Sequence, residues 1–267
     1  MVGVAVVVGV GPGLGLSIAR RFAREKYTVA ILSRDLEKLT KMAEDIVEKE
    51  KSGQVCAIRI DCADPKSVKE AFEAVNSLGP VEALVYNTNT PFPWPPPKFT
   101  EINVESFQRS ITIPCVGAFL CVQQVIQGMV ERQKGTLLFT GATASMRGGA
   151  GFSEIACGKF ALRALAQSLA REYQPQGIHV AHIIVDGVIS SARYSPPPQH
   201  YGIPHRNIFQ KFQHAAEPDM GARYNTIREE DAMIKPDEIA ETYWHVHSQH
   251  KSAWTHELDV RPFPEKF

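Results

Sequence analysis

The sequence lacks an excess of charge of either sign, because 29 lysines and arginines balance 29 aspartates and glutamates. A neutral chain has no general attraction to the phosphates of nucleic acid or to an acidic membrane surface, so we expect neither as a partner. The chain also lacks an apolar run of the roughly 18 residues that a membrane-spanning helix needs. Its first apolar run is short and has no basic leader, which predicts a buried strand and not a secretory signal.

Cysteine is scarce and irregularly spaced. The five cysteines are odd in number and include no CxxC pair: Cys56, Cys62, Cys115, Cys121 and Cys157. This pattern disfavours a disulfide framework and a zinc site, and it fits a reducing compartment. Three histidines, His245, His247 and His250, have no carboxylate or cysteine at ligand spacing, so we expect no metal. The final Glu-Lys-Phe is not a peroxisomal address, and we therefore expect a cytoplasmic protein.

Strand-like and helix-like segments alternate along most of the chain. We predict strands at 4–8, 27–32, 55–61, 81–87, 135–141, 179–185 and 254–260, and helices at 16–25, 36–49, 65–76, 104–131, 152–173 and 236–247. This alternation indicates βαβ units and a parallel sheet covered on both faces. We therefore predict an α/β fold, a single Rossmann-like, doubly wound domain over residues 1–267 with about seven strands.

Glycine is concentrated directly after the first predicted strand. Val4–Val8 is followed by glycines and then by a helix-like segment, LSIARRFAREK. Glycines let the backbone turn sharply and approach a pyrophosphate, while a helix N-terminus supplies free N–H groups and a partial positive charge. The arrangement predicts a nucleotide-binding turn; a glycine-rich turn without a ligand is the alternative. The residues expected to contact the cofactor here are Gly9, Gly11, Gly13, Leu14 and Gly15.

The end of the second predicted strand bears on the choice of nucleotide. An acidic residue at this point would bind a ribose 2′-hydroxyl and repel a 2′-phosphate. The chain instead has Ser33 followed by Arg34, and a guanidinium suits the 2′-phosphate of NADP. Asp35 comes next and either caps the following helix or points to NAD. We therefore predict that NADP(H) is preferred and keep NAD(H) as the alternative.

Polar residues also close the third and fourth predicted strands. Asp61 is placed to accept a hydrogen bond from an adenine amino group, with Cys62 beside it, although a turn-capping aspartate is the alternative. Asn87 ends the fourth strand, where an amide can tie neighbouring strands together and border the cofactor. The carboxyl edge of a doubly wound sheet is where ligands bind, so all three residues are expected at the nucleotide site.

Together these features resemble the short-chain dehydrogenase/reductase family over essentially the whole chain. The family's TGxxxGxG motif is present with Val8 in place of threonine, and residues 137–180 are similar to its catalytic strand and helix. The resemblance implies an NADP-linked oxidoreductase that acts on a small-molecule alcohol, aldehyde or ketone. It also implies that Lys159, the lysine of YxxxK, binds the nicotinamide ribose. Gly187 and Val188 are the cofactor contacts expected after the sixth strand.

The same alignment of motifs shows which catalytic groups are missing. Ile155 lies where the family has its tyrosine, Ala142 where it has serine, and Pro114 where it has the helix asparagine. Isoleucine cannot donate a proton, and carbonyl reduction needs a donor beside the reacting carbonyl. We therefore predict a non-standard proton donor. Tyr194 and Tyr201 are the candidate replacement acids, and weaker candidates are Tyr86, Thr143, Ser145 and Ser153.

The missing groups leave two interpretations of function open. One is an oxidoreductase with an unusual donor, in which residues at about 190–235 form the substrate lid, as in the resembled family. The other is a non-catalytic nucleotide-binding subunit that pairs with a catalytically complete relative through the family's helix-to-helix surface. The first predicts a homodimer or homotetramer, and the second predicts a hetero-oligomer. Cys157, on the catalytic helix, is expected to be a small buried residue.

Overall fold

A computed structural model describes residues 3–51, 53–93, 96–190 and 233–263. Its seven-stranded sheet has the order β3-β2-β1-β4-β5-β6-β9, and every pairing is parallel. The strands are β1 Val4–Val8, β2 Thr28–Ser33, β3 Val55–Arg59, β4 Val81–Tyr86, β5 Gly135–Ala142, β6 Ile178–Val185 and β9 Glu257–Val260. The predicted α/β, doubly wound class is confirmed. The strand order reverses between β1 and β4, the position at which such sheets bind ligands.

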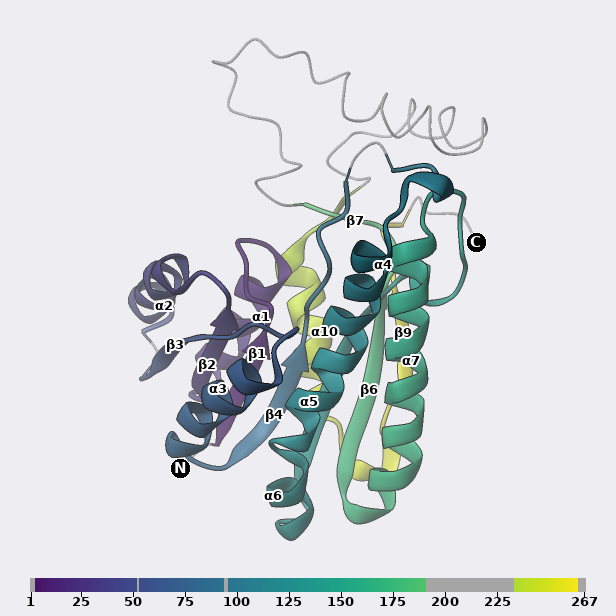
Figure 1. The fold of residues 1–267 in the computed structure, drawn as a ribbon. Coiled ribbons are helices and arrows are strands. Elements are labelled where there is room, and N and C mark those ends of the chain that lie inside the picture. The colour runs from purple at the N-terminus through teal and green to yellow at the C-terminus, as the bar shows by residue number, and fades with distance from the viewer. Residues whose placement is uncertain (1–2, 52, 94–95, 191–232, 264–267) are drawn as a thin grey trace.

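Helices cover both faces of the sheet (Figure 1). They are α1 Leu14–Arg24, α2 Leu36–Glu50, α3 Pro65–Ser77, α4 Val104–Ile111, α5 Gly117–Gln123, α6 Ile126–Glu131, α7 Ser153–Tyr173 and α10 Pro236–Ser248. The side chains of β1 show how the two layers share one strand. Val4, Val6 and Val8 pack with residues of α3, α5 and α7, while Ala5 and Val7 pack with residues of α1, α2 and α10. A strand buried on both faces is therefore apolar throughout.

A short parallel pair was not predicted. It consists of β7 (Val188–Ile189) and β8 (Met233–Ile234), which pair outside the main sheet. These two strands bring residues 190 and 233 to neighbouring positions. The lid predicted at about 190–235 lies almost entirely outside the described residues, and so do Tyr194 and Tyr201. The extent of the single domain over 1–267 also stays a prediction.

Two predicted element boundaries were wrong. The helix expected over 104–131 is divided into α4, a wider π-type turn at Thr112–Val116, α5 and α6. Pro114 has no N–H to donate to the preceding turn, so the regular helix is interrupted there. The last strand begins at Glu257 and not at Trp254, because the Trp254 indole donates to the Gln249 carbonyl (3.3 Å) and its ring stacks on His179.

The interrupted helix packs closely against α7 at Gly158. A Cβ at this position would collide with the Ser110 carbonyl oxygen and lie 2.7 Å from Cγ of Pro114. We expect Gly158→Ala to lower the free energy of unfolding by about 1–3 kcal/mol, because neither helix can yield easily. Denaturant titration measures this change.

Gly128 on α6 provides the matched control. A Cβ there would meet only the flexible end of Arg132, at 3.1 Å, so Gly128→Ala should leave stability unchanged or raise it by up to about 1 kcal/mol. Equal effects of the two substitutions would contradict the proposed close contact between the helices.

Candidate active site

The first glycine of the predicted turn lies against the end of β4. Gly9 has a φ of +89°, and a Cβ on it would lie 2.5 Å from the Asn87 carbonyl oxygen. The Asn87 side-chain amide donates to the Gly9 carbonyl at 3.1 Å, and its backbone N–H donates to the Val8 carbonyl at 2.8 Å. The amide thus ties β4 to the turn after β1, as the sequence predicted. Only glycine fits at position 9, because both the dihedral and the space exclude a side chain.

The rest of the turn presents the N-terminus of α1 to the carboxyl edge. The N–H groups of Leu16 and Ser17 donate back to the Gly13 carbonyl at 3.1 and 3.2 Å. Leu14 and Gly15 occupy the first two positions of α1. A helix leaves the N–H groups of its first residues without an intrahelical partner. The first turn contains no acidic residue. A Cβ on Gly11 would meet no atom within 4 Å, so this side of the turn is open. These features fit the binding of a pyrophosphate.

The residues predicted to select the nucleotide lie at the end of β2. Ser33 is half-buried and Arg34 is exposed just beyond it. Asp35 caps α2 by accepting from the Lys38 N–H at 3.1 Å, and its carboxylate also pairs with the Lys38 ammonium at 2.7 Å. Asp35 therefore has a structural role, and Arg34 remains at the tip of the strand.

The turn after β3 holds the residues expected near adenine. The Asp61 carboxylate accepts from the Ala63 N–H at 3.0 Å, which is the turn-capping role named as its alternative. Cys62 is buried, and a Cβ on Gly117 of α5 would lie 2.8 Å from its Cβ. A contact of either residue with adenine stays a prediction.

Lys159 is buried at the centre of the carboxyl edge, with only 3% of its surface exposed. Its ammonium donates to the Thr140 carbonyl at 2.8 Å and to the Thr88 carbonyl at 3.3 Å, at the ends of β5 and β4. Burial lowers the pKa of Lys159 to about 8, because the charged form loses its hydration. Lys159 is therefore bound to the same strand end that Asn87 ties to the glycine turn.

The three positions that lack catalytic groups lie on α7, at the end of β5 and in the π-type turn. Ile155 is half-buried one turn before Lys159 on α7, Ala142 ends β5, and Pro114 is buried in the π-type turn. The Ala142 N–H donates to the Ser145 hydroxyl at 3.1 Å. The structure thus brings Ile155, Lys159 and the end of β5 together, as the motif spacing implies.

Several candidate donors have other partners. The Tyr86 hydroxyl donates to the Ile113 carbonyl in the π-type turn, and complete burial raises the pKa of Tyr86 well above its usual value. Thr143 donates to the Asp186 carboxylate, and Ser145 is fully buried. The expectation that Cys157 is buried was wrong, since its side chain faces outward from α7 and is exposed.

Sequence reasoning missed a buried polar cluster beside Lys159. His182 of β6 is fully buried and its Nδ1 lies 2.9 Å from the Glu257 carboxylate, which Arg163 of α7 binds with two hydrogen bonds of 2.6 and 2.7 Å. Burial lowers the pKa of His182. No short motif could reveal this cluster, because His182 and Glu257 are 75 residues apart along the chain.

A second polar group lies after β6, where Asp186 precedes Gly187 and Val188. Asp186 is buried, accepts from Thr143 and lies 3.4 Å from the Arg261 guanidinium. Gly187 packs so closely on Pro262 that a Cβ would lie 2.7 Å from the proline ring. The one available signal was the aspartate itself, in the place of the family's proline.

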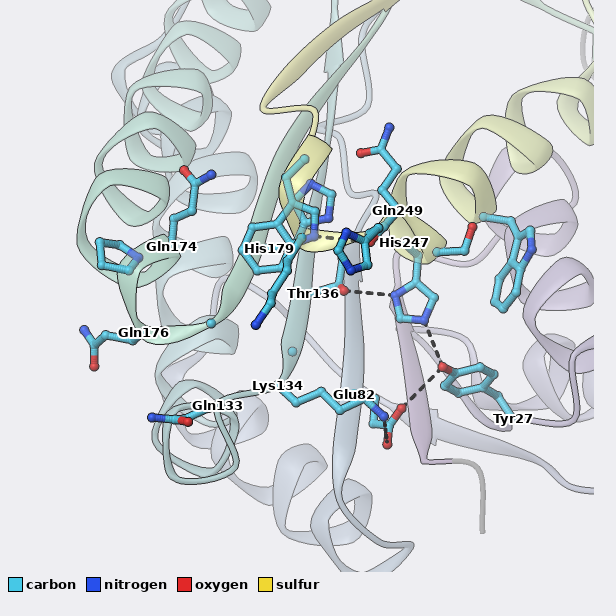
Figure 2. Close-up of a pocket in the computed structure, with 18 residues that line it drawn as sticks. Tyr27, Glu82, Gln133, Lys134, Thr136, Gln174, Gln176, His179, His247 and Gln249 are labelled. Carbon is cyan, nitrogen blue, oxygen red and sulfur yellow. Dashed lines mark hydrogen bonds and ion pairs between the residues drawn. The ribbon is translucent and has the colours of Figure 1, made fainter.

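A separate pocket of about 840 Å³ lies at the opposite, amino edge of the sheet (Figure 2). In it, the Thr136 hydroxyl lies 3.0 Å from Nδ1 of His247, and the Tyr27 hydroxyl lies 2.9 Å from Nε2 of the same ring. The Tyr27 hydroxyl donates to Glu82 at 3.3 Å, and Lys134 donates to the same carboxylate at 2.9 Å. The Nε2 of His247 must then donate to Tyr27, and its Nδ1 accepts from Thr136. These groups satisfy one another, which indicates a structural role.

No three metal-binding side chains lie close enough to hold an ion in the described ranges, and no helix there is long and apolar enough to cross a membrane.

The fold and its carboxyl edge define a nucleotide-binding α/β protein. A family model described as short chain dehydrogenase matches residues 3–195. The chain belongs to this family.

Relatives and solved structures agree with this assignment. The chain is 30% identical over 180 residues to 3-dehydrosphinganine reductase of Danio rerio, covering 66% of this chain and 53% of that protein. It is 29% identical over 179 residues to very-long-chain 3-oxoacyl-CoA reductase of Emericella nidulans, which covers 66% of this chain and 51% of that protein. The chain therefore spans about half the length of these curated relatives. A short-chain dehydrogenase from Rhodopseudomonas palustris has a TM-score of 0.74 at 29% identity, covering 98% and 99% of the two chains.

A more distant neighbour shows the same fold with a nucleotide bound. It is an alcohol dehydrogenase from Thermococcus sibiricus complexed with 5-hydroxy-NADP, with a TM-score of 0.78 at 22% identity and coverage of 100% and 99%. This likeness shows that the two chains share one fold.

The buried histidine of the amino edge generates a prediction about pH. Burial lowers the pKa of His247 to about 4, against about 6.5 when unfolded. Between these values the unfolded chain binds a proton that the folded chain does not, so stability falls as pH falls from about 6.5 to about 4. Between these pH values we expect the free energy of unfolding to change by roughly 2–3 kcal/mol less in His247→Gln than in the wild type.

The measurement is denaturant unfolding at several pH values. His245→Gln, at an exposed position of the same helix, is the control and should keep the wild-type pH dependence. If the His247→Gln curve also parallels the wild type, His247 is not buried in its neutral form.

Proposed function

We propose that the chain is an NADP(H)-linked oxidoreductase of the short-chain dehydrogenase/reductase type with a non-standard proton donor. The observation that carries this proposal is the complete nucleotide side of the site beside an incomplete catalytic side. At the carboxyl edge Asn87 donates to the Gly9 carbonyl, and Lys159 donates to the carbonyl of the next residue, Thr88. In contrast, the side chains of Ile155 and Ala142 have no group that transfers a proton. A bound reduced nicotinamide supplies the two electrons and the hydrogen that a carbonyl carbon accepts.

Each part of the site has a task in this proposal. The N-terminus of α1, with Gly11, Gly13, Leu14 and Gly15, holds the pyrophosphate by N–H groups and the helix dipole. Lys159 holds the nicotinamide ribose and fixes its orientation against the ends of β4 and β5. Asp61 and Cys62 border the adenine, and Gly187 and Val188 border the nicotinamide.

Arg34 supports the choice of NADP(H) over NAD(H). It is exposed at the end of β2, and the nearby acid, Asp35, is already committed to capping α2 and to pairing with Lys38. A guanidinium there can bind a 2′-phosphate in a charge-assisted contact.

The substrate class is a small-molecule carbonyl or alcohol, and the relatives narrow it further. Both curated relatives described above are named as reductases of 3-oxo compounds with long chains. We propose a 3-oxo group on a long alkyl chain as the substrate, with the segment at about 190–235 forming the lid over it. A long-chain 3-oxo ester, ethyl 3-oxododecanoate, is a suitable probe.

A second candidate function is that of a nucleotide-binding subunit paired with a catalytically complete relative. The observation that favours association is a set of exposed apolar side chains around α5 and α7: Val116 (41% exposed), Phe119 (45%) and Phe160 (42%). Such a surface is typical of a protein interface. A homodimer or homotetramer fits the enzyme interpretation, and a hetero-oligomer with a YxxxK-containing chain fits the subunit interpretation. All five cysteines are free, which supports a cytoplasmic location.

The nucleotide choice is tested by titrating the protein with NADPH and NADH. We expect NADPH to bind more tightly, and Arg34→Ala to lose about 1.5–3 kcal/mol of NADPH binding with little change for NADH. Lys49→Ala, in the last turn of α2, is the control and should keep the preference. Equal affinities of the wild type for both nucleotides would rule out the proposed role of Arg34.

The catalytic side is tested by restoring the missing groups. The wild-type chain should oxidise NADPH slowly with the 3-oxo ester, and Ile155→Tyr combined with Ala142→Ser should raise the rate. General acid catalysis contributes about 10²–10⁴-fold, so even a partial gain is measurable. The subunit function would be favoured instead by three results together. Neither protein oxidises NADPH, both still bind it, and a YxxxK-containing relative co-purifies with the chain.

A further inference from the structure

Two arginines at one corner of the carboxyl edge have no bonded partner. Most arginines that the structure describes donate to a carboxylate or a carbonyl oxygen, as Arg24 does to Glu50. Arg34, directly after β2, and Arg59, the last residue of β3, make no such bond within the described ranges, and both are exposed. Their guanidinium groups are therefore available to an anion from outside the chain.

The strand register places Arg59 beside Ser33. β2 and β3 are parallel with Ser33 paired to Arg59, and the Ile60 N–H donates to the Ser33 carbonyl at 2.9 Å. Paired residues of neighbouring strands direct their side chains to the same face, and their backbones are about 4.8 Å apart. Ser33 and Arg34 stand where the ribose 2′-position of the nucleotide is expected. Arg59 thus lies on the same face as Ser33, one strand further out.

Arg34 also lies close to the turn that follows β3. The pKa of the Cys62 thiol in this turn is lowered mainly by a hydrogen bond with Cys121, and the charge of Arg34 adds to the lowering. A charge acts on a pKa in this way only over a short distance, so the Arg34 guanidinium is near the turn. Arg59 ends the strand that leads into the same turn. The two cations therefore reach one corner of the sheet from neighbouring strands.

The acids around this corner do not neutralise the two arginines. Each acid on the adjoining segments has another partner: Asp35 has Lys38, Glu37 has Lys41, Asp61 has the Ala63 N–H and Asp64 has the Lys66 N–H. In the part of the chain that the structure describes, no ion pair includes either arginine. Like charges on neighbouring strands repel each other, and a bound anion removes this repulsion. The corner therefore suits a group that carries more than one negative charge.

We propose that Arg59 binds the 2′-phosphate of NADP(H) together with Arg34 and is a second residue that selects this nucleotide over NAD(H). The inference rests on the proposed function. A phosphate monoester carries about two negative charges and three acceptor oxygens near neutral pH, which is more than one guanidinium compensates. One guanidinium from each strand compensates both charges. NAD(H) has a neutral hydroxyl at the same atom, so Arg59 adds little to its binding.

A cation on β3 could also act without any nucleotide. β3 is an edge strand of the sheet (Figure 1), and a charged side chain on such a strand prevents pairing with another chain. That task needs the charge and no ligand. The two tasks are therefore distinguished by whether substitution of Arg59 changes the affinity for a 2′-phosphate.

The test compares adenosine 2′,5′-bisphosphate with AMP, which differ only in the 2′-phosphate and contain no nicotinamide. Their affinities are measured by calorimetric titration of the wild type and of Arg59→Gln, each checked for folding by thermal melting. We expect Arg59→Gln to bind the bisphosphate about tenfold more weakly and AMP less than about twofold more weakly. Arg171→Gln, at the end of α7 on the amino edge, is the matched control and should bind both probes as the wild type does.

NADPH and NADH should follow the same pattern. Arg59→Gln should weaken NADPH by the same factor and leave NADH nearly unchanged. Arg59→Lys keeps the charge but not the planar fork of donors, so it should lose only part of the affinity. When Arg34→Gln and Arg59→Gln are combined, the preference for the bisphosphate over AMP should disappear. The bisphosphate affinity of the wild type should also fall more steeply with added salt than that of Arg59→Gln.

Three contrary results separate this inference from the proposed function. An unchanged bisphosphate affinity in Arg59→Gln, with Arg34→Gln still weakened, would overturn the role of Arg59 and leave the proposed nucleotide choice in place. Equal losses for the bisphosphate and AMP would overturn it too, because Arg59 would then support the fold of the site and not the phosphate. A wild type that binds both probes equally would overturn the proposed choice of NADP(H) first, and the role of Arg59 with it.

Discussion

The contact between Gly9 and Asn87 positions the rest of the carboxyl edge. At this point the sheet reverses direction, and β1 and β4 end side by side. The left-handed conformation of Gly9 allows its backbone to touch Asn87, whose amide returns a hydrogen bond to it. A larger residue at either place would separate the glycine turn from β4. The next residue, Thr88, then provides one of the two carbonyls that hold Lys159. Asn87 and Thr88, the two residues directly after β4, thus connect the glycine turn with the buried lysine.

The second constraint is the burial of a positive charge without an anionic partner. Three acids, Glu154, Asp186 and Glu257, are each bound by another residue, and no carboxylate of the described residues pairs with Lys159. Two backbone carbonyls compensate the ammonium only in part, and its pKa falls to about 8. The same desolvation disfavours the charged form of Lys159 in the folded chain, so the burial of this ammonium costs stability.

The features that could be predicted from the sequence depend on neighbouring residues. The apolar run Val4–Val8, the glycines after it and the Asp64-Pro65 start of α3 are local signals, and the structure confirms the strand and the cap, where Asp64 accepts from the Lys66 N–H at 3.0 Å. Pro114 is also a local signal, and it marks the break in the helix predicted over 104–131. Motif spacing also identified Lys159, Ile155 and Ala142 as neighbours of one site.

The features that could not be predicted depend on contacts between distant segments. Glu257 joins His182 and Arg163 across three elements. His247 of α10 is joined to β5 through Thr136, and to β4 through Tyr27 and Glu82. Trp254 left the predicted strand because His179 and Gln249 bind it. Cys157 faces outward because the opposite side of α7 is occupied by Gly158 against Ser110. Each of these outcomes follows from packing, for which a single sequence contains no direct signal.

A crystal structure of the chain with NADP+ tests the central claim most directly, because it places the nucleotide and the lysine in one view. The account predicts the pyrophosphate at the N-terminus of α1, the 2′-phosphate against Arg34, and Nζ of Lys159 within hydrogen-bond distance of the nicotinamide ribose. A nucleotide bound with its nicotinamide outside this edge, or a Lys159 ammonium paired with a carboxylate in the complex, would contradict it.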